Sequence, residues 1–241
     1  PEDHTPLLLN GLNLRIPAGH LVALNGDTGA GKSVLLAMAL GLVRPTEGTV
    51  SIDGRPLNRY DLPALRRQIG YVTQQPALFD GTVMDNLTLF QPEMQDAAMQ
   101  AAKLTGLDEQ LQRLANGYET LVGDATGTRL SGTLRQQVAI TRALVPNPAI
   151  LILDEPNAFL DAQADKNLRL LLRALKGRVT ILLVTHRPSL MNLADDVYRI
   201  VDGRLKLETE ACGTEPAKTV SSDGVRHLDK HTPHRIRGGA A

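Results

Sequence analysis

Residues 26–33 read Gly26-Asp27-Thr28-Gly29-Ala30-Gly31-Lys32-Ser33, between an apolar run at residues 20–25 and a helix-prone run at residues 34–40. Because glycine adopts backbone torsions closed to other residues, successive N–H groups of such a loop can turn toward phosphate oxygens at the positive end of the following helix. Lys32 is expected to reach the β- and γ-phosphates, and Ser33 to bind Mg²⁺. The stretch therefore predicts a nucleotide-binding loop, with a chance glycine turn as the alternative.

A pair of carboxylates follows a second apolar run. Residues 150–153 are continuously apolar, as in a strand covered on both faces, and lead directly into Asp154 and Glu155. Ligands of open α/β sheets bind at the carboxyl ends of the strands. We expect Asp154 to hold Mg²⁺ and Glu155 to deprotonate an attacking water. The alternative is that the pair only caps the helix that follows.

The composition limits the classes of partner. Lys plus Arg and Asp plus Glu are equal at 26 each, which removes the basic excess expected of a protein that grips nucleic acid. Aromatic residues are 3% and tryptophan is absent, so platforms for base stacking are not expected. A single cysteine, Cys212, gives no disulfide framework and indicates a reducing compartment. We therefore expect no nucleic-acid partner.

The chain contains no run of about 18 to 20 apolar residues that could span a bilayer. Any link to a membrane is therefore expected to come through a partner. The chain begins at Pro1 rather than at methionine, which favours a processed protein or a piece of a longer polypeptide.

The order of apolar patterns predicts an α/β fold with a mainly parallel sheet. Residues 150–153 and 179–184 are expected as buried strands on either side of a helix at 162–175. Residues 12–16 alternate polar and apolar, and residues 48–54 resemble a strand that ends in an Asp-Gly turn. Residues 195–207 are expected as a hairpin that turns at Asp202 and Gly203.

Four parts are expected along the chain. Runs of β-branched residues disappear between residues 82 and 145, where helical spacing takes over, and the chain after Glu208 is polar without an apolar pattern. The predicted parts are residues 1–81, the first part of an ATP-binding core; 82–145, a helical subdomain; 146–208, the second part of the core; and 209–241, a flexible polar tail.

The order of the motifs resembles the ATP-binding cassette family, over nearly the whole chain up to about Leu207. After the phosphate-binding loop, five further motifs follow in the family's order. They are the glutamine loop Tyr71-Val-Thr-Gln74-Gln-Pro-Ala-Leu-Phe79, the signature motif Leu130-Ser-Gly-Thr-Leu-Arg-Gln-Gln137, the Walker B pair Asp154-Glu155 with the D-loop Asn157-Ala-Phe-Leu-Asp161, and the switch histidine in Thr185-His186. The resemblance implies a P-loop NTPase fold with an N-terminal antiparallel β portion and an inserted α-helical subdomain.

The resemblance also implies roles for single residues. Gln74 would reach Mg²⁺ or the attacking water, Glu155 would be the general base, and His186 would contact the γ-phosphate, with Lys32 completing the catalytic set. Ser131 and Gly132 would begin a helix whose N-terminus faces the γ-phosphate of a partner cassette. Asp161 would lie across the dimer interface.

The implied function is that of the nucleotide-binding domain of a membrane exporter, with ATP and Mg²⁺ as ligands and ATP-driven dimerisation as its motor. The expected partners are a transmembrane domain, in the same polypeptide or a separate subunit, and a second nucleotide-binding domain, as a homo- or heterodimer. The expected location is the cytoplasmic face of a membrane, such as the bacterial inner membrane. A soluble cassette ATPase acting on DNA or ribosomes is an alternative.

The signature departs from the family pattern, because Thr133 and Leu134 follow Gly132 where Gly and Gln are usual. If that position needs a positive φ or a close approach to phosphate, threonine would cost about 1 to 3 kcal/mol of strain, and Leu134 cannot supply an amide hydrogen bond. A second hypothesis is therefore a weakly active module, the degenerate half of a heterodimer. The aromatic ring that this family stacks on adenine would fall just before Pro1.

Overall fold

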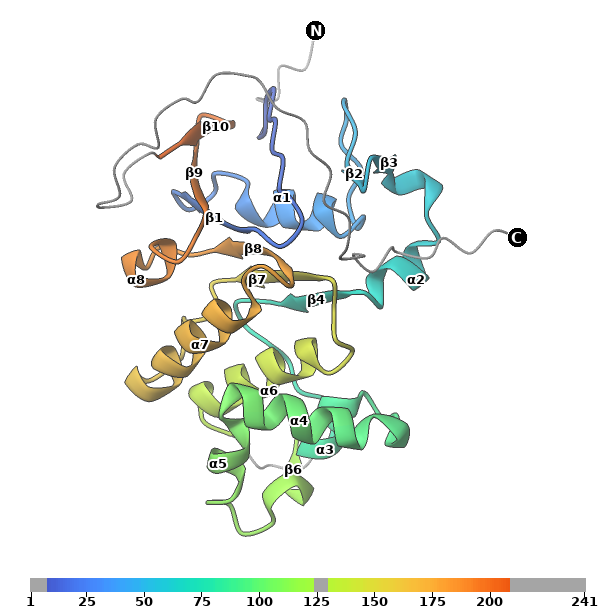
Figure 1. The fold of residues 1–241 in the computed structure, drawn as a ribbon, viewed down its shortest axis with the longest axis vertical. Coiled ribbons are helices and arrows are strands. Elements are labelled where there is room, and N and C mark those ends of the chain that lie inside the picture. Colours follow the sequence, from blue (N-terminus) through green and yellow to red (C-terminus); the bar gives the residue numbers. More distant parts are fainter. Residues whose placement is uncertain (1–7, 124–129, 209–241) are drawn as a thin grey trace, which may run out of the picture.

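The central element of the fold is a six-stranded sheet in the order β10-β9-β1-β8-β7-β4 (Figure 1). The computed structural model describes residues 8–123 and 130–208. Neighbouring strands run parallel except at the edge, where β10 is antiparallel to β9. The strands are β1 (Leu21–Gly26), β4 (Ile69–Val72), β7 (Ile150–Asp154), β8 (Thr180–Val184), β9 (Asp196–Val201) and β10 (Arg204–Leu207). The predicted α/β fold with a mainly parallel sheet is confirmed.

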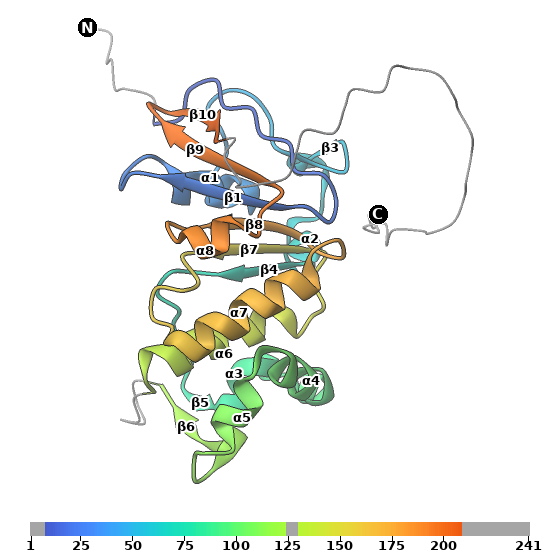
Figure 2. The ribbon, with the colours of Figure 1, turned by 60° about the vertical axis from the view of Figure 1, so that its left-hand side comes forward.

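Helices cover both faces of this sheet, which explains the continuous apolar runs. The helices are α1 (Lys32–Ala39), α2 (Leu62–Arg66), α3 (Val83–Thr88), α4 (Gln95–Thr105), α5 (Leu107–Leu111), α6 (Gly132–Leu144), α7 (Ala162–Leu175) and α8 (Pro188–Met191), with 3₁₀ turns at Leu57–Arg59, Pro92–Met94 and Gly117–Glu119. In β7, Ile152 packs in the same cluster as Leu36 of α1, whereas Leu153 packs with the residues of α6 and α7. Figure 2 shows α1 on one side of the sheet and α6 and α7 on the other.

The helices α3 to α6 form the lower part of the molecule in Figure 1. The stretch expected to be helical, from residue 82 to 145, holds these four helices in its described part, together with a short antiparallel pair, β5 (Gly81–Thr82) and β6 (Leu121–Val122). Thr82 caps α3 in a reciprocal capping box with Asp85. A Thr-x-x-Asp sequence is the local signal of such a capping box.

The N-terminal β portion is smaller than expected. Residues 12–16 form no strand in the structure, although their alternation is kept as alternating burial, and Leu14 and Ile16 pack against the cluster under α1. They pair with no neighbouring strand, so the pattern predicted which side chains are buried but not the hydrogen bonding. The antiparallel portion is the hairpin of β2 (Ser51–Ile52) and β3 (Arg55–Pro56).

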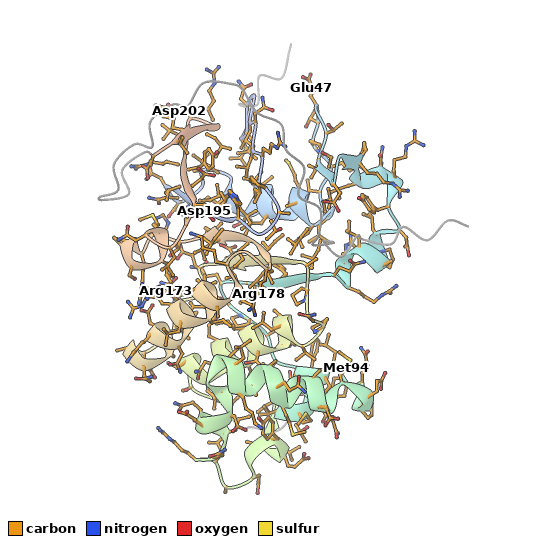
Figure 3. The ribbon with its side chains drawn as sticks, viewed as in Figure 1. Glu47, Met94, Arg173, Arg178, Asp195 and Asp202 are labelled. Atoms are coloured by element: carbon orange, nitrogen blue, oxygen red, sulfur yellow. The ribbon has the colours of Figure 1, made fainter. Side chains whose placement is uncertain are left out.

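Both predicted Asp-Gly turns are present. Asp53 and Gly54 join β2 to β3 with φ of 50° and 73°, and Asp202 and Gly203 join β9 to β10 with φ of 51° and 72°. Positive φ at both central residues is what a type I′ hairpin turn requires. Asp202 stands at the tip of its hairpin (Figure 3). In the part of the chain that is described, no helix is long and apolar enough to traverse a lipid bilayer.

Candidate functional site

The predicted motifs meet at one edge of the sheet. Strands β4, β7, β8 and β1 are adjacent and parallel, so their carboxyl ends lie side by side. The phosphate-binding loop follows β1, Asp154 and Glu155 end β7, His186 follows β8, and Gln74 follows β4. This is the edge at which ligands of open α/β sheets bind.

The loop at residues 26–31 leads into α1 and leaves the start of that helix uncapped. Gly31 is the N-cap residue, with a φ of 94° and no side chain to accept from the first amides. The first turn of α1 carries no acidic residue, so no carboxylate offsets the positive end of the helix dipole. Within the loop Thr28 and Gly29 are exposed and Ala30 is partly buried. The geometry is that of an anion-binding site.

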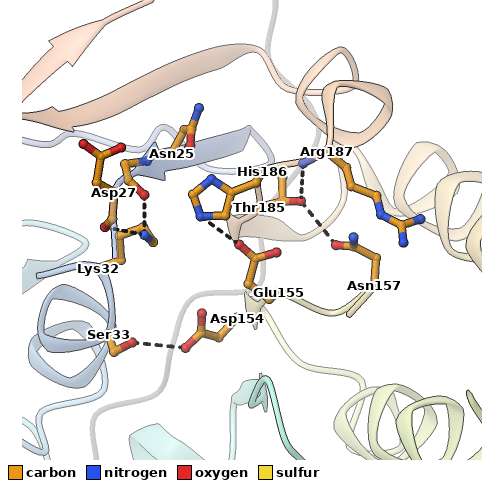
Figure 4. A network of polar contacts seen from close by, with 11 residues as sticks. Asn25, Asp27, Lys32, Ser33, Asp154, Glu155, Asn157, Thr185, His186 and Arg187 are labelled. Atoms are coloured by element: carbon orange, nitrogen blue, oxygen red, sulfur yellow. Dashed lines mark hydrogen bonds and ion pairs between the residues drawn. The ribbon is translucent and has the colours of Figure 1, made fainter. Parts of the chain in front are cut away.

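Lys32 is folded back onto its own loop. Its Nζ donates to the carbonyl oxygens of Gly26 and Asp27, the latter at 2.9 Å (Figure 4). The Asp27 carboxylate lies 3.4 Å from the guanidinium of Arg199 on β9, in an exposed ion pair. The ammonium group is thus held within the loop, where a phosphate group would meet it.

Two oxygen ligands suited to Mg²⁺ meet across the edge. The Ser33 hydroxyl donates to Oδ2 of Asp154 at 3.4 Å. Burial raises the pKa of Asp154 above its ordinary value, while the hydrogen bond from Ser33 and the charge of Lys32 act to lower it. A hydroxyl and a carboxylate are donors of the kind that Mg²⁺ takes, usually with several waters and phosphate oxygens. The residues present therefore fit a magnesium ion.

Glu155 has an unusual backbone and an unsatisfied side chain. Its φ is 46°, which is sparsely populated by residues other than glycine, and its N–H donates to the carbonyl of Val184 at 2.9 Å. Its Oε1 lies 3.4 Å from Nε2 of His186 but forms no hydrogen bond within the described chain. The side chain is 15% exposed, against 52% for His186. A buried oxygen without a hydrogen bond is available to a ligand or a water.

Burial raises the pKa of Glu155 above its ordinary value. The electrostatic interaction with His186 and a hydrogen bond from its backbone act to lower that pKa, and the neighbouring charge of Asp154 adds to the rise. A carboxylate with a raised pKa is a stronger base than an exposed one, so the environment favours proton transfer at Oε1.

A buried hydrogen bond that we did not predict fixes the two loops that carry Glu155 and His186. The Thr185 hydroxyl donates to Oδ1 of Asn157 at 3.2 Å and accepts from the N–H of Arg187 at 3.1 Å. Thr185 is 0% and Asn157 3% exposed. Each is adjacent or close to a motif residue, but nothing in the sequence indicates that these two side chains pair.

The other predicted site residues form no hydrogen bond or ion pair with these groups in the described part of the chain. Gln74 is exposed two residues after β4, and its side chain has no hydrogen bond to any described residue. Ser131 caps α6 by accepting from the N–H of Leu134 at 3.2 Å, and Asp161 caps α7 by accepting from Ala164 at 2.8 Å. Ser131, Gly132 and Asp161 form no hydrogen bond or ion pair with the phosphate-binding loop as far as the chain is described.

The positive φ that would strain Thr133 is absent. Thr133 lies in the first turn of α6 and is not among the described residues with positive φ. Its hydroxyl donates to the carbonyl of Phe159 at 2.8 Å. The next side chain, Leu134, packs against the main hydrophobic cluster. The helical start of the signature thus accommodates both departures from the family pattern without a strained backbone.

Comparison with known proteins gives a consistent set of relatives. A family model described as "ABC transporter" matches residues 9–158. The chain is 40% identical over 200 residues to the multidrug resistance protein pgp-1 of Caenorhabditis elegans, which covers 82% of this chain and 15% of that protein. It is 38% identical over 205 residues to the ATP-dependent lipid A-core flippase of Saccharophagus degradans, which covers 85% of this chain and 35% of that protein.

A solved structure has the same fold. The structure of a bacterial Atm1-family ABC exporter with ATP bound superposes with a TM-score of 0.79 and 32% sequence identity, over 86% of this chain and 36% of that one. This chain therefore spans only about 15 to 36% of the length of these three proteins.

Proposed function

The chain belongs to the ABC transporter family, and from that premise we propose that it is the nucleotide-binding domain of an exporter, which hydrolyses Mg·ATP to drive transport. The observation that carries the proposal is the convergence of three groups at one sheet edge. They are the Lys32 ammonium in its glycine loop, the Ser33–Asp154 oxygen pair, and the buried Glu155 beside His186.

The site binds the triphosphate through the loop. The uncapped amides of α1 and the Lys32 ammonium meet the phosphate oxygens, which offer the negative charge that this helix end lacks. Residues Gly26 to Gly31 surround the phosphates with backbone N–H groups. Ser33 and Asp154 would hold the magnesium ion, and Gln74, which follows β4, would reach it or the attacking water. When bound, Mg²⁺ supplies positive charge that offsets the negative charge of the phosphate oxygens.

Glu155 acts on the attacking water. Its Oε1, free of hydrogen bonds and raised in pKa by burial, accepts the proton as the water oxygen approaches the γ-phosphorus. His186 lies 3.4 Å from that oxygen, orients the carboxylate and donates to the γ-phosphate. The Thr185–Asn157 hydrogen bond holds the loop that carries Glu155 against the loop that carries His186.

The proposal extends to partners and location. Two such domains would sandwich ATP, with Ser131 and Gly132 at the start of α6 completing the partner's site and Asp161 at the interface. A transmembrane domain, in the same polypeptide or a separate subunit, would place this chain at the cytoplasmic face of a membrane. The similarity to a bacterial exporter supports a bacterial inner membrane. Residues 1–81 and 146–208 are proposed as the two core parts and residues 82–145 as the inserted helical subdomain. Residues 209–241, expected as a flexible tail, lie outside the described residues.

No observation favours the degenerate module that the altered signature suggested. The start of α6 is regular, and Lys32, Glu155 and His186 are all present. Low activity of the isolated chain has no support of its own either.

The test of the proposed function is Mg²⁺-dependent ATP turnover by the full chain. We expect saturable ATP binding in equilibrium dialysis, phosphate release that stops when EDTA removes Mg²⁺, and ATP-dependent dimerisation in sedimentation analysis. A chain that binds no ATP at millimolar concentration, with or without Mg²⁺, would refute the proposal.

A further inference from the structure

The loop from Glu155 to Asp161 is tightly organised around its own backbone. The N–H of Ala158 donates to the carbonyl of Glu155 at 3.0 Å, and that of Leu160 donates to the carbonyl of Asn157 at 3.3 Å. Glu155 opens the loop with its positive φ. Glu155 and Ala158 therefore belong to one hydrogen-bonded turn.

Both ends of this loop are anchored. Near its start, Asn157 accepts the buried hydrogen bond from Thr185. At its end, Asp161 caps α7. Its middle, at Phe159, projects from the surface, with the side chain 47% exposed.

The start of α6 provides the middle of the loop with two contacts. Thr133 donates its hydroxyl proton to the Phe159 carbonyl at 2.8 Å. Gly132 lies so close that a Cβ on it would be 3.2 Å from the Cβ of Phe159, tighter than most contacts of this kind. Because Gly132 has no side chain, the start of α6 can approach Phe159 closely, and Thr133 then forms a hydrogen bond to the Phe159 carbonyl. This bond links the start of the signature helix to the loop that carries Glu155, in one chain.

We propose that Thr133 is a positioning residue, whose hydrogen bond to Phe159 sets the place of the 155–161 loop and thereby the direction of Glu155. The effect on ATP turnover that this proposal predicts rests on the proposed function. Glycine at position 133 has no hydroxyl and cannot form the bond, so the departure from the family pattern provides this contact. Through the bond, a displacement of α6 moves the loop with it.

The first test compares Thr133→Val, which has the same shape without the donor, with Thr133→Ser, which keeps the hydroxyl. In steady-state ATP turnover by the full chain, we expect Thr133→Val to lower kcat about three- to tenfold, the range of one net hydrogen bond, with KM unchanged. Thr133→Ser keeps the donor and should retain the wild-type kcat. Wild-type kcat in the valine variant, or an equal loss in the serine variant, would overturn the proposal.

The control is Thr46→Val, at an exposed threonine outside any helix or strand whose side chain makes no hydrogen bond to described residues. It should leave kcat and KM as they are. A fall in kcat equal to that of Thr133→Val would show that the effect is not specific to the bond, and would overturn the proposal.

The second test does not depend on ATP. In hydrogen–deuterium exchange of the full chain without nucleotide, Thr133→Val should speed exchange of the Ala158 and Leu160 amides about threefold or more, while Thr133→Ser and Thr46→Val should not. Unchanged exchange in the valine variant would overturn the positioning role. If the wild-type chain neither bound nor hydrolysed ATP, the proposed function would fail, and this measurement would still decide whether Thr133 holds the loop.

Discussion

The starts of α1 and α6 are two helix N-termini of opposite character. Gly31 precedes α1 and offers no side chain, so the first amides of α1 have no cap and no acidic neighbour. Ser131 precedes α6 and accepts from the N–H of Leu134, so part of that start is satisfied by its own chain. The α1 end depends on a ligand for its hydrogen bonds, whereas the α6 end has a partner already.

The difference indicates that the two helix starts have different roles. The phosphate-binding side is assembled within one chain, because Ser33 and Asp154 already meet and Lys32 is held within its loop. The signature side is stable alone, through the Ser131 cap and the Thr133 bond, and can present its helix end to another molecule. Substitutions on the first side should abolish chemistry, and those on the second should have smaller effects on turnover, stability and assembly.

The largest expected effect is at Glu155. Glu155→Gln removes the proton acceptor but keeps the shape of the side chain. We expect kcat to fall about 10²- to 10⁴-fold, with ATP binding retained and an ATP-bound dimer accumulating in sedimentation analysis. Glu109→Gln, on the exposed first turn of α5, is the control and should have normal turnover. Hydrolysis at the wild-type rate in Glu155→Gln would place the base elsewhere.

The next largest effect is on binding. Lys32→Ala removes the ammonium from the loop, and with it charge-assisted hydrogen bonds to the phosphates. We expect the affinity for ATP, measured by equilibrium dialysis, to fall about 100-fold. Lys103→Ala on α4 removes an exposed lysine of the same charge and should bind as the wild type does. Equal affinities in the two variants would contradict the role of Lys32.

Much of this site could be predicted because its signals are local. The glycine loop, the strand at residues 150–153 and the acidic pair that ends it are each continuous in sequence. Burial on both faces of the sheet explains the apolar runs. The two Asp-Gly pairs predicted hairpin turns correctly because few other residues accept a positive φ at both central positions. Periodicity and turn chemistry therefore located the sheet and its carboxyl edge.

What could not be predicted depends on packing between distant segments. The Thr185–Asn157 bond joins residues 28 apart, and the Thr133–Phe159 bond residues 26 apart, and no pattern of residue types marks either pair. The positive φ on which strain at Thr133 would depend is absent, because the helix begins at Gly132 and places Thr133 in its first turn. The alternation at residues 12–16 predicted burial without a strand, since pairing needs a neighbouring edge that the sequence does not identify.

A smaller effect concerns pH. Because burial raises the pKa of Glu155, its carboxylate is protonated at a higher pH than an exposed glutamate, whose pKa is about 4.3. A base works only when deprotonated, so kcat should fall as the pH drops through that raised pKa. His186 acts to lower the pKa of Glu155, so His186→Ala should move the midpoint of the kcat–pH profile to a higher pH. The residual kcat of this variant would be measured over the same pH range. A midpoint that stays in place or moves down would show that His186 does not act on Glu155.

The smallest expected effect separates two roles of Asp161. Its carboxylate caps α7, so Asp161→Ala should lower the free energy of unfolding by about 1 kcal/mol in urea titration. Asp161→Asn can still accept from the N–H of Ala164 and should have nearly wild-type stability. If the charge of Asp161 also acts across a dimer interface, the asparagine variant will dimerise less readily with ATP while it unfolds at the same urea concentration. If it dimerises like the wild type, Asp161 acts only within its own chain, and the interface role proposed for it fails.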